Sequence, residues 1–475
     1  MSGSFGGIYI SSSGLYSSQA ALNVTSSNIS NADVEGYTRQ QVMQTDLSPN
    51  YTDQTLYGGG TSISEIRHIR SAYLDASYRE ENSSLGYWQT TSSALTHIEN
   101  SLSYSEENSL FNTSEEFFNA WEEASKSPDD ASARVNVTQQ GALMVETFDQ
   151  LSKDLIALTD QIQTEITNTV DTINSISASI NDLNKAIKIA TSLGTNSTLL
   201  EDERNQLLDE LSTYGDVNIL EKSDGSIDVY FGNQTLINDS GNRTLSHTSL
   251  ADGSTSLVWE DNGYPLELNT GTLKSLQDLT QTYTGPVPAF ESDTIGFLSA
   301  YEQTLDYYAT ILVDEVNAIH SSSIDLDGGT GNAFFIAVDS DEPIGLSNIQ
   351  VNPLLDDHTN LALSESGLSG DGSAASQISN LKDTALLSDG ASSITFEQYC
   401  SQLTEWTGFT LQSATTHSET QNAVVYQLSN ERLSVMAVSL DEEMNNMIMY
   451  QQSYNANAAV IDVLDQLLEQ VINQM

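Results

Sequence analysis

Apolar residues recur every seven positions near both ends of this chain. Near the N-terminus the repeat consists of Ile8, Leu15, Leu22 and Ile29. The longer repeat near the C-terminus consists of Leu433, Leu440, Met447, Tyr454, Ile461, Leu468 and Met475. Because a seven-residue repeat places apolar side chains along one side of a helix, these two seams predict a coiled coil. It would form between the two ends of one chain or between neighbouring copies. Neither Pro nor Gly interrupts residues 433–475, so we expect one unbroken helix there. A terminal amphipathic helix packed on its own domain is the alternative.

Three long helices are predicted between these ends. Residues 67–103 contain no Pro and a single Gly, and their apolar positions are three, four or seven residues apart. Residues 111–126 place three aromatic residues on one face, and Pro128 ends that helix. This face is more typical of a buried core than of an anchor for a partner, which is the alternative. Residues 131–193 repeat apolar side chains at the period of a straight helix, which predicts a rod about 95 Å long.

The pattern changes to strands after this rod. Residues 216–273 alternate apolar and polar side chains, and Asp224–Gly225 is a hairpin signal. Helix is predicted again over 294–320, loops with short strands over 332–393, and helix from residue 395 to the end.

This order of elements predicts an α+β fold with long antiparallel helices, coiled-coil-like termini and a small inserted antiparallel β domain. We expect four parts. Residues 1–45 and 430–475 form a terminal helical assembly domain that is disordered in the monomer. Residues 46–215, 290–335 and 394–429 form a long-helix rod domain. Residues 216–289 form the β domain, and residues 336–393 are a loop and short-strand segment attached to the rod domain.

Charge restricts the possible partners of the chain. It contains 15 basic and 66 acidic side chains, a net charge of −51, and all but nine of the acids lie within residues 46–429. Nucleic acid and anionic membranes are therefore excluded as partners, because both require clustered Lys and Arg. The acidic middle is expected to face solvent, and a saline habitat would screen its repulsion. The nearly uncharged N-terminus is suited to packing.

Candidate chemistry is sparse. The six His residues show no metal-ligand spacing, and neither HExxH nor GxSxG occurs. Cys400 is the only cysteine, so no intrachain disulfide is possible, and we expect it to be a small core residue. The stretch from Asp325 to Gly329 begins like a calcium loop but lacks the later ligands, so we interpret it as a turn. We therefore expect no catalytic residue, no metal and no cofactor.

Residues 14–40 resemble the N-terminal signature of bacterial flagellar rod, hook and hook-associated proteins. Among the matching residues are Asn23, Asn28, Gly36 and Tyr37. Further stretches are similar to hook-associated proteins that join hook and filament. They are residues 117–121 with Pro128 and Arg134, residues 203–212 with 224–226, residues 316–320 with 325–328 and 334–335, and residues 438–444 with 450–456.

This resemblance implies a structural junction protein that assembles on the distal end of the hook. It implies export without a cleavable signal through the flagellar type III apparatus, consistent with the absence of an apolar leader. The implied partners are hook protein, hook-associated protein 3, further copies in a ring and an export chaperone. The implied assembly residues are Ile8, Leu15, Leu22, Asn23, Asn28, Ile29, Gly36, Tyr37, Leu433, Leu440, Met447, Tyr454, Ile461 and Leu468. The alternatives are another axial protein, such as hook protein, and a secreted wall-acting enzyme.

Overall fold

The computed structural model describes residues 2–34, 36–47, 50–52, 55–57, 59–102, 109–250, 254–287, 290, 295–368 and 370–473. Contacts divide the chain into two compact units. Unit 1 contains Met1–Ser83, Ile173–Thr244 and Gln421–Met475, and unit 2 contains Ser84–Thr172 and Leu245–Thr420. Segments from both ends of the chain therefore belong to the same unit.

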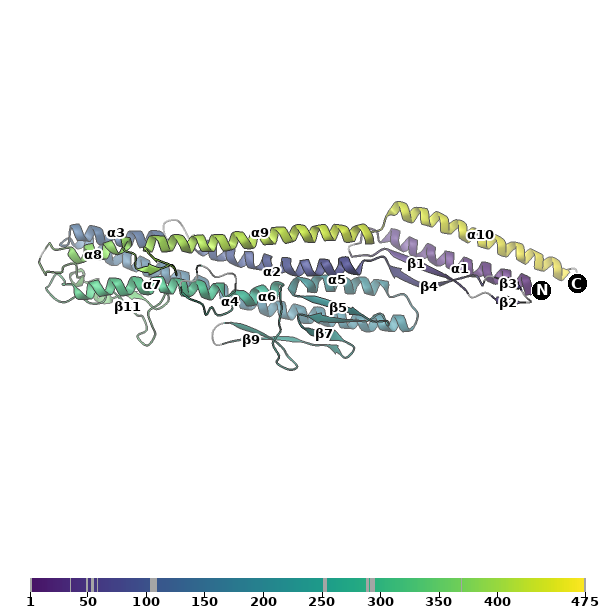
Figure 1. Cartoon of the computed structure of the whole chain (residues 1–475), viewed down its shortest axis with the longest axis horizontal. Coiled ribbons are helices and arrows are strands. Elements are labelled where there is room, and N and C mark those ends of the chain that lie inside the picture. Colours follow the sequence, from purple (N-terminus) through teal and green to yellow (C-terminus); the bar gives the residue numbers. More distant parts are fainter. Residues whose placement is uncertain are drawn as a thin grey trace. The chain divides into compact units, whose positions relative to one another are not determined.

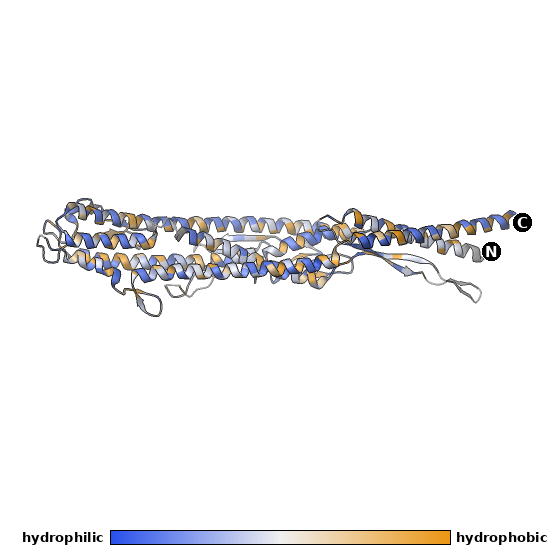
Figure 2. Ribbon diagram, turned by 90° about the horizontal axis from the view of Figure 1, so that it is seen from above, coloured by the Kyte–Doolittle hydropathy of each residue, from blue (hydrophilic) through white to orange (hydrophobic). Residues whose placement is uncertain are grey.

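Long helices combined with small antiparallel sheets confirm the α+β fold (Figure 1). The longest helices are α2 (Ala72–Leu102), α4 (Ala131–Ser192), α7 (Phe297–Ser322) and α9 (Phe396–Met436). Hydrophobic and hydrophilic residues alternate in short stretches along the helices (Figure 2), as expected for helices that bury one side. Helix α4 contains 62 residues, which confirms the long helix predicted at 131–193.

Unit 2 is built around an aromatic core. Helix α3 (Leu110–Lys126) buries Phe117, Phe118 and Trp121 completely, as its pattern predicts. The ring of Trp121 lies 5.3 Å from that of Phe334, between ring centroids. The other elements of this unit are α6 (Thr272–Leu279), α8 (Ser373–Asn380), the hairpins β9 (Leu245–Ser249) with β10 (Thr255–Trp259), β11 (Phe335–Ile336) with β12 (Gln350–Val351) and β13 (Leu387–Ser388) with β14 (Ser393–Ile394), and the short turns η2 (Pro353–Asp356), η3 (His358–Asn360) and η4 (Leu381–Asp383).

Two expectations about individual residues of unit 2 are confirmed. Cys400 is buried, and burial raises the pKa of its thiol to about 12. The segment after Asp325 is a turn, in which Asp325 Oδ1 accepts hydrogen bonds from the backbone N–H groups of Asp327 at 3.0 Å and Gly329 at 2.6 Å. The carboxylate thus stabilises the local backbone.

Unit 1 contains a four-stranded antiparallel sheet in the order β5 (Val217–Glu221), β6 (Ile227–Phe231), β7 (Gln234–Asn238) and β8 (Gly241–Asn242). Gly225 has φ +81° in the turn between β5 and β6, so the Asp224–Gly225 hairpin is confirmed. Helix α5 (Thr198–Tyr214) precedes the sheet. Of the strands predicted over 216–273, β9 and β10 group with unit 2 instead. The four-part division of the chain remains a prediction.

A hairpin in unit 1 was missed by the sequence analysis. Strands β1 (Gln40–Asp46) and β4 (Thr61–His68) pair antiparallel, from Gln40 with His68 to Asp46 with Thr61. The short strands β2 (Asn50–Thr52) and β3 (Thr55–Tyr57) pair beyond them. Because β4 extends to residue 68, α2 begins at Ala72, and the helix start predicted at 67 is wrong.

The predicted unbroken C-terminal helix is also wrong. Helix α9 ends at Met436, and α10 (Leu440–Asn473) begins after a three-residue interruption, while Met475 lies outside the described residues. The sequence Ser439-x-x-Glu442 is a capping-box signal, and the Glu442 N–H lies 3.5 Å from Ser439 Oγ. We call residues 437–439 the elbow.

Candidate functional site

The two ends of the chain form an antiparallel helix pair within unit 1. Helix α1 (Ser2–Ser30) lies beside α10 (Figure 1). Four contacts define the register, and the residue numbers of each pair add to the same total. The pairs are Gly7 with Leu464, Gly14 with Asn457, Ser18 with Ser453 and Asn28 with Glu443. This pairing confirms that α1 and α10 contact each other within one chain; contact between copies remains a prediction.

Small and polar residues form the contact face of α1. A Cβ atom at Gly14 would lie 2.8 Å from Asn457 Nδ2, so a larger residue there would displace the Asn457 side chain. Ser18 Oγ donates to Ser453 Oγ at 3.1 Å. The buried residues of α1 are Ser11, Ser17, Ser18, Ala21, Val24, Thr25 and Asn28. Their spacing of three, four and seven residues follows the heptad period.

The apolar N-terminal seam lies at the margin of this face. Ile8, Leu15, Leu22 and Ile29 are half-buried, and Asn23 is exposed. The seven-residue spacing therefore identified the helix correctly but not its most buried face. The reason is that close helix contact favours small side chains, and the larger ones pack beside it.

The C-terminal seam divides at the elbow. Met447, Tyr454, Ile461 and Leu468 are half-buried and lie within one turn of the α10 residues that contact α1. Leu433 and Leu440, which flank the elbow, are 52% and 49% exposed. The structure thus brings four of these six residues to the helix pair and leaves two at the surface.

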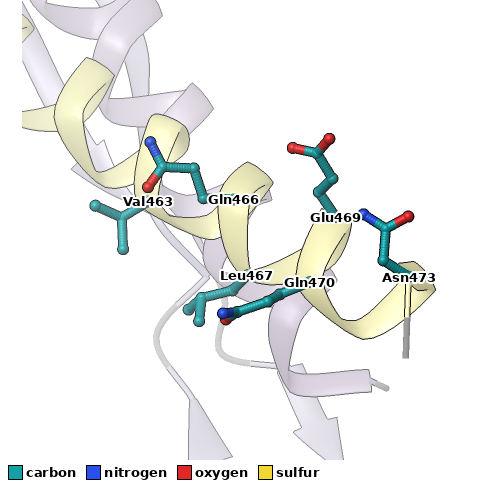
Figure 3. Close-up of a pocket in the computed structure, with 6 residues that line it drawn as sticks. All are labelled: Val463, Gln466, Leu467, Glu469, Gln470 and Asn473. Carbon is teal, nitrogen blue, oxygen red and sulfur yellow. The ribbon is translucent and has the colours of Figure 1, made fainter. Parts of the chain in front are cut away.

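A second apolar stripe on α10 was not singled out by the sequence analysis. It consists of Met449, Val460, Val463 and Leu467, which are 47–55% exposed, and we call it the outer stripe. Val463 and Leu467 project from the same side of the helix. They help line an open hollow together with Gln466, Glu469, Gln470 and Asn473 (Figure 3). Exposed apolar residues at heptad spacing are typical of a helix that contacts a further partner.

Asn28 connects α1 to strand β1 and to α10. Its Oδ1 accepts hydrogen bonds from the Gln40 N–H at 3.0 Å and from the Tyr37 hydroxyl at 2.9 Å. Its Nδ2 donates to the Gln40 carbonyl at 2.9 Å and to Glu443 Oε2 at 3.2 Å. Asn28 is 1% exposed, so this fully bonded amide is a buried hub. Tyr37 is half-buried, and burial raises its pKa.

Arg39 neutralises the acidic start of α10. Its Nη1 lies 2.8 Å from Glu442 Oε2, and its Nη2 lies 2.8 Å from Glu443 Oε1. Glu443 is 2% exposed, and a buried carboxylate is tolerated only where a positive charge and hydrogen bonds compensate it. The backbone N–H of Arg39 also donates to the Met436 carbonyl at 3.0 Å. One residue therefore contacts both sides of the elbow.

Gly36 allows the segment after α1 to approach α5. Its φ is +78°, a conformation that L side chains rarely adopt. A Cβ atom at this position would lie 1.5 Å from Gln206 Nε2. Two residues further on, the Thr38 N–H donates to Asp202 Oδ2 at 3.1 Å.

An ion-pair cluster holds the end of α9 to α2 and α5. Arg432 Nε lies 2.8 Å from Asp75 Oδ1, and Arg432 Nη2 lies 2.7 Å from Asp209 Oδ2. Arg79 Nε binds the other Asp209 oxygen at 2.6 Å, and Arg70 binds Asp75 at 3.0 Å through Nε and Nη2. Three of the 15 basic side chains of the whole chain, Arg70, Arg79 and Arg432, therefore lie in this one cluster.

The electrostatics of this cluster favour ionised carboxylates. Burial alone would raise the pKa of Asp75, but hydrogen bonds from Arg70 and the charges of Arg70, Arg432 and Arg79 outweigh it. The pKa of Asp75 is therefore held below its ordinary value. The Arg432 guanidinium also lies 4.3 Å from the centre of the Tyr78 ring. The sequence analysis missed this cluster because it joins three segments that are more than a hundred residues apart, residues 70–79, Asp209 and Arg432.

Residues 95–335, just over half of the chain, match the family model described as flagellar hook-associated protein FlgK helical domain. The chain belongs to the flagellar hook-associated protein FlgK family. Residues 8–38 match the model of the flagella basal body rod protein, and residues 429–475 match the model of the flagellar basal body rod FlgEFG protein C-terminal region. These two segments contain most of α1, the elbow and α10, so the matches coincide with the helix pair.

Relatives of the FlgK family are similar along their whole length. Flagellar hook-associated protein 1 of Bacillus subtilis is 28% identical over 507 residues, with 100% of this chain and 99% of the relative covered. The protein of the same name from Escherichia coli is 24% identical, with 97% and 98% covered. The solved flagellar hook junction protein FlgK from Burkholderia pseudomallei shares the fold, with a TM-score of 0.63 at 14% identity, covering 77% of this chain and all of that one.

FlgK-family membership makes the chain a structural protein of the flagellum that associates with other axial components. Among the described residues, no group of three or more His, Cys, Asp or Glu side chains is placed to hold a metal ion. In the same described part of the chain, no helix is long and apolar enough to cross a membrane.

Proposed function

We propose that this chain assembles on the distal end of the flagellar hook and connects it to the filament through the next hook-associated protein. The observation that carries the proposal is the α1–α10 pair, which unites the two ends of the chain and leaves the outer stripe at the surface. A stripe of this kind supports contact with further helices, as a tubular assembly requires.

The proposed partners follow from this position. Hook protein binds on one side, hook-associated protein 3 on the other, and further copies of the chain complete a ring. An export chaperone covers the apolar terminal residues before assembly, and the chain leaves the cell through the flagellar type III apparatus without a cleavable signal. No nucleic acid or membrane takes part, and the role is structural and not enzymatic.

Ordering of the ends is coupled to assembly in this proposal. Residues 1–45 and 430–475 are disordered before incorporation, and burial of the terminal seams and the outer stripe compensates for the lost conformational entropy. The three remaining parts, the rod, the β domain and the segment 336–393, form the body. The acidic residues concentrated in 46–429 face solvent around the axial core.

The test places charge on the outer stripe. Val463→Asp with Leu467→Asp should give hooks without filaments and loss of motility, because an unpaired carboxylate is costly in an apolar contact. Both residues are at least half exposed, so the melting temperature of the purified chain should stay within about 1 °C of wild type. Electron microscopy of isolated hooks and calorimetry of the purified protein provide the two measurements.

The control adds the same charge elsewhere on the same helix. Gln451→Asp with Asn455→Asp alters exposed polar positions that do not line the hollow, and it should leave filaments intact. Normal filaments on the Val463→Asp, Leu467→Asp strain would contradict the role of the outer stripe. Loss of filaments in both strains would show that added charge alone is responsible.

A further inference from the structure

A groove lies between helix α1 and the hairpin of β1 and β4, within unit 1. Ser13 joins its two sides, because its Oγ accepts the Thr61 N–H at 3.1 Å. On the α1 side the groove is lined by Tyr9 and Tyr16, which are 58% and 68% exposed. None of the described residues that line it is charged. We call this surface, from Tyr9 to Tyr16 on α1 and from Thr61 to Ile63 on β4, the tyrosine groove.

The two tyrosines face away from α10. Gly7 and Gly14 contact α10, and each tyrosine comes two residues after one of these glycines. Two residues correspond to about 200° around a helix. Tyr9 and Tyr16 therefore project from the side of α1 opposite to its contact with α10.

The outer stripe of α10 lies on another side of the helix pair. Val463 comes one residue before Leu464, which contacts Gly7, so Val463 lies about 100° around the helix from α1. One chain thus has two different surfaces, which allow each copy to bind the next through unlike faces. Contacts of this kind repeat from copy to copy and close a ring when the rotation between copies allows it.

The chemistry of the two surfaces is complementary. The outer stripe is apolar, but it lies on a helix with six acidic and no basic side chains. Acidic surfaces, which a net charge of −51 makes common in this chain, repel such a helix, whereas the tyrosine groove presents no carboxylate to it. Tyrosine adds a ring for apolar contact and a hydroxyl that can donate to a carboxylate beside the stripe.

Ser17 is an independent sign that the groove is incomplete in a single chain. It lines the groove and is 3% exposed, and within the described part of the chain its hydroxyl has no hydrogen-bond partner. A buried hydroxyl without a partner is costly. A polar side chain brought by an incoming helix would remove that cost.

We propose that the tyrosine groove of one copy binds the outer stripe of the next copy in the assembled junction. This inference rests on the proposed function, which places copies in a ring, and it names the surfaces through which they meet. Gly7 lies opposite Leu464, so in this antiparallel register Tyr9 is level with Asp462, about 1.5 Å along the helix from Val463. In a ring whose axis is parallel to the helix pair, rotation keeps this level, and Tyr9 of one copy meets Val463 of the next.

Disulfide cross-linking in flagella isolated from cells tests this contact where the ends of the chain are assembled. Cys400 is buried and the pKa of its thiol is raised, so it gives no background. One strain produces Tyr9→Cys and Val463→Cys chains together, and two further strains produce each variant alone. After mild oxidation, an immunoblot should show a dimer in the mixed strain and only monomer in the single strains, because unlike surfaces must meet.

Two matched controls define the level and the side of the contact. Tyr16→Cys lies in the same groove but about 10.5 Å further along α1, so it should give no dimer with Val463→Cys. It should instead give a dimer with Ala456→Cys, which is at its own level. Tyr73→Cys is 77% exposed but lies on α2, outside the groove, and should give no dimer with Val463→Cys.

Absence of the dimer from a mixed strain with normal filaments would overturn the contact, as would an equal yield with Tyr73→Cys. A dimer in the Val463→Cys strain alone would show that copies meet through like surfaces and would also overturn it. If Tyr9→Cys prevents assembly, Ile63→Cys on the other wall of the groove replaces it with the same expectation. Normal filaments without the dimer leave the proposed function intact, whereas normal filaments on the Val463→Asp, Leu467→Asp strain contradict the role of the outer stripe itself.

Discussion

Asp209 offers the sharpest test of how unit 1 is held together. It binds Arg79 through Oδ1 at 2.6 Å and Arg432 through Oδ2 at 2.7 Å, and thereby connects α5 to α2 and α9. Asp209→Asn keeps the shape of the side chain but removes its charge. Arg79, whose side chain is 7% exposed, then loses its ion-pair partner, while Arg432 retains Asp75.

These contacts allow an estimate of the free energy of unfolding that Asp209→Asn removes. Breaking a buried ion pair by removing one partner costs about 3–5 kcal/mol. Because Asp209 is 22% exposed and Arg432 stays paired, we expect the lower limit, about 3 kcal/mol. For a unit of this size that corresponds to a decrease of about 9 °C in melting temperature, at roughly 3 °C per kcal/mol.

The positions of the tryptophans separate the two units in the assay. All four, Trp88, Trp121, Trp259 and Trp406, belong to unit 2, so their fluorescence reports that unit alone. Circular dichroism at 222 nm also includes the helices of unit 1. Asp209→Asn should therefore introduce an earlier transition in the dichroism and leave the fluorescence transition in place.

The matched control is Glu210→Gln, which removes a charge from the next, exposed residue. In a chain with net charge −51 this change should be neutral or slightly stabilising, because it reduces repulsion. If both variants shift the dichroism transition equally, the ion-pair cluster does not stabilise unit 1. If Asp209→Asn lowers the fluorescence transition as well, the two units do not unfold separately.

Two further predictions concern pH and the backbone. Burial lowers the pKa of His320 from 6.5 to about 4, so the unfolded chain takes up a proton at a pH where the folded chain does not. Unit 2 should thus lose about 3 kcal/mol as the pH falls from 6.5 to 4, and urea denaturation followed by tryptophan fluorescence should show a smaller loss for His320→Gln. Gly225→Ala should destabilise unit 1 by about 2 kcal/mol, since its φ is +81° and an added Cβ atom would lie 3.0 Å from Thr191 Oγ1 and 3.1 Å from Ile187 Cγ2. Gly194→Ala, at φ +65° in open space, should cost only about 1 kcal/mol in the same thermal dichroism assay.

The parts of the fold that depend on local pattern were predictable. The apolar period of residues 131–193 extends over many turns and has a single structural solution, a long helix. The aromatic face around Phe117, Phe118 and Trp121 indicated the core, because large aromatic side chains on one side of a helix are usually buried. Asp224–Gly225 specified its hairpin because few residue pairs adopt that turn without strain.

The parts that depend on distant partners were not predictable. Strands β1 and β4 alternate weakly and form a hairpin whose environment includes α1, so residues 61–68 had no strand signal of their own. Asp75, Asp209 and Arg432 are separated by more than a hundred residues each, and only folding brings them together. The elbow carried a local signal for a helix start, Ser439-x-x-Glu442, but the continuous heptad repeat predicted an unbroken helix. In the structure Arg39 contacts residues on both sides of the break, which neither pattern could predict.

The uncharged sequence of α1 is a physical condition for the pairing of the chain ends. Helix α10 contains six acidic and no basic side chains, whereas α1 contains no charged side chain. If α1 carried acids at the average frequency of the chain, about four carboxylates would lie beside those six, with repulsion that would rise as salt is removed. Only Arg39, just outside α1, supplies a positive charge at the start of α10. The pairing of α1 with α10 therefore needs no salt to screen repulsion between the two helices, although the chain as a whole has a net charge of −51.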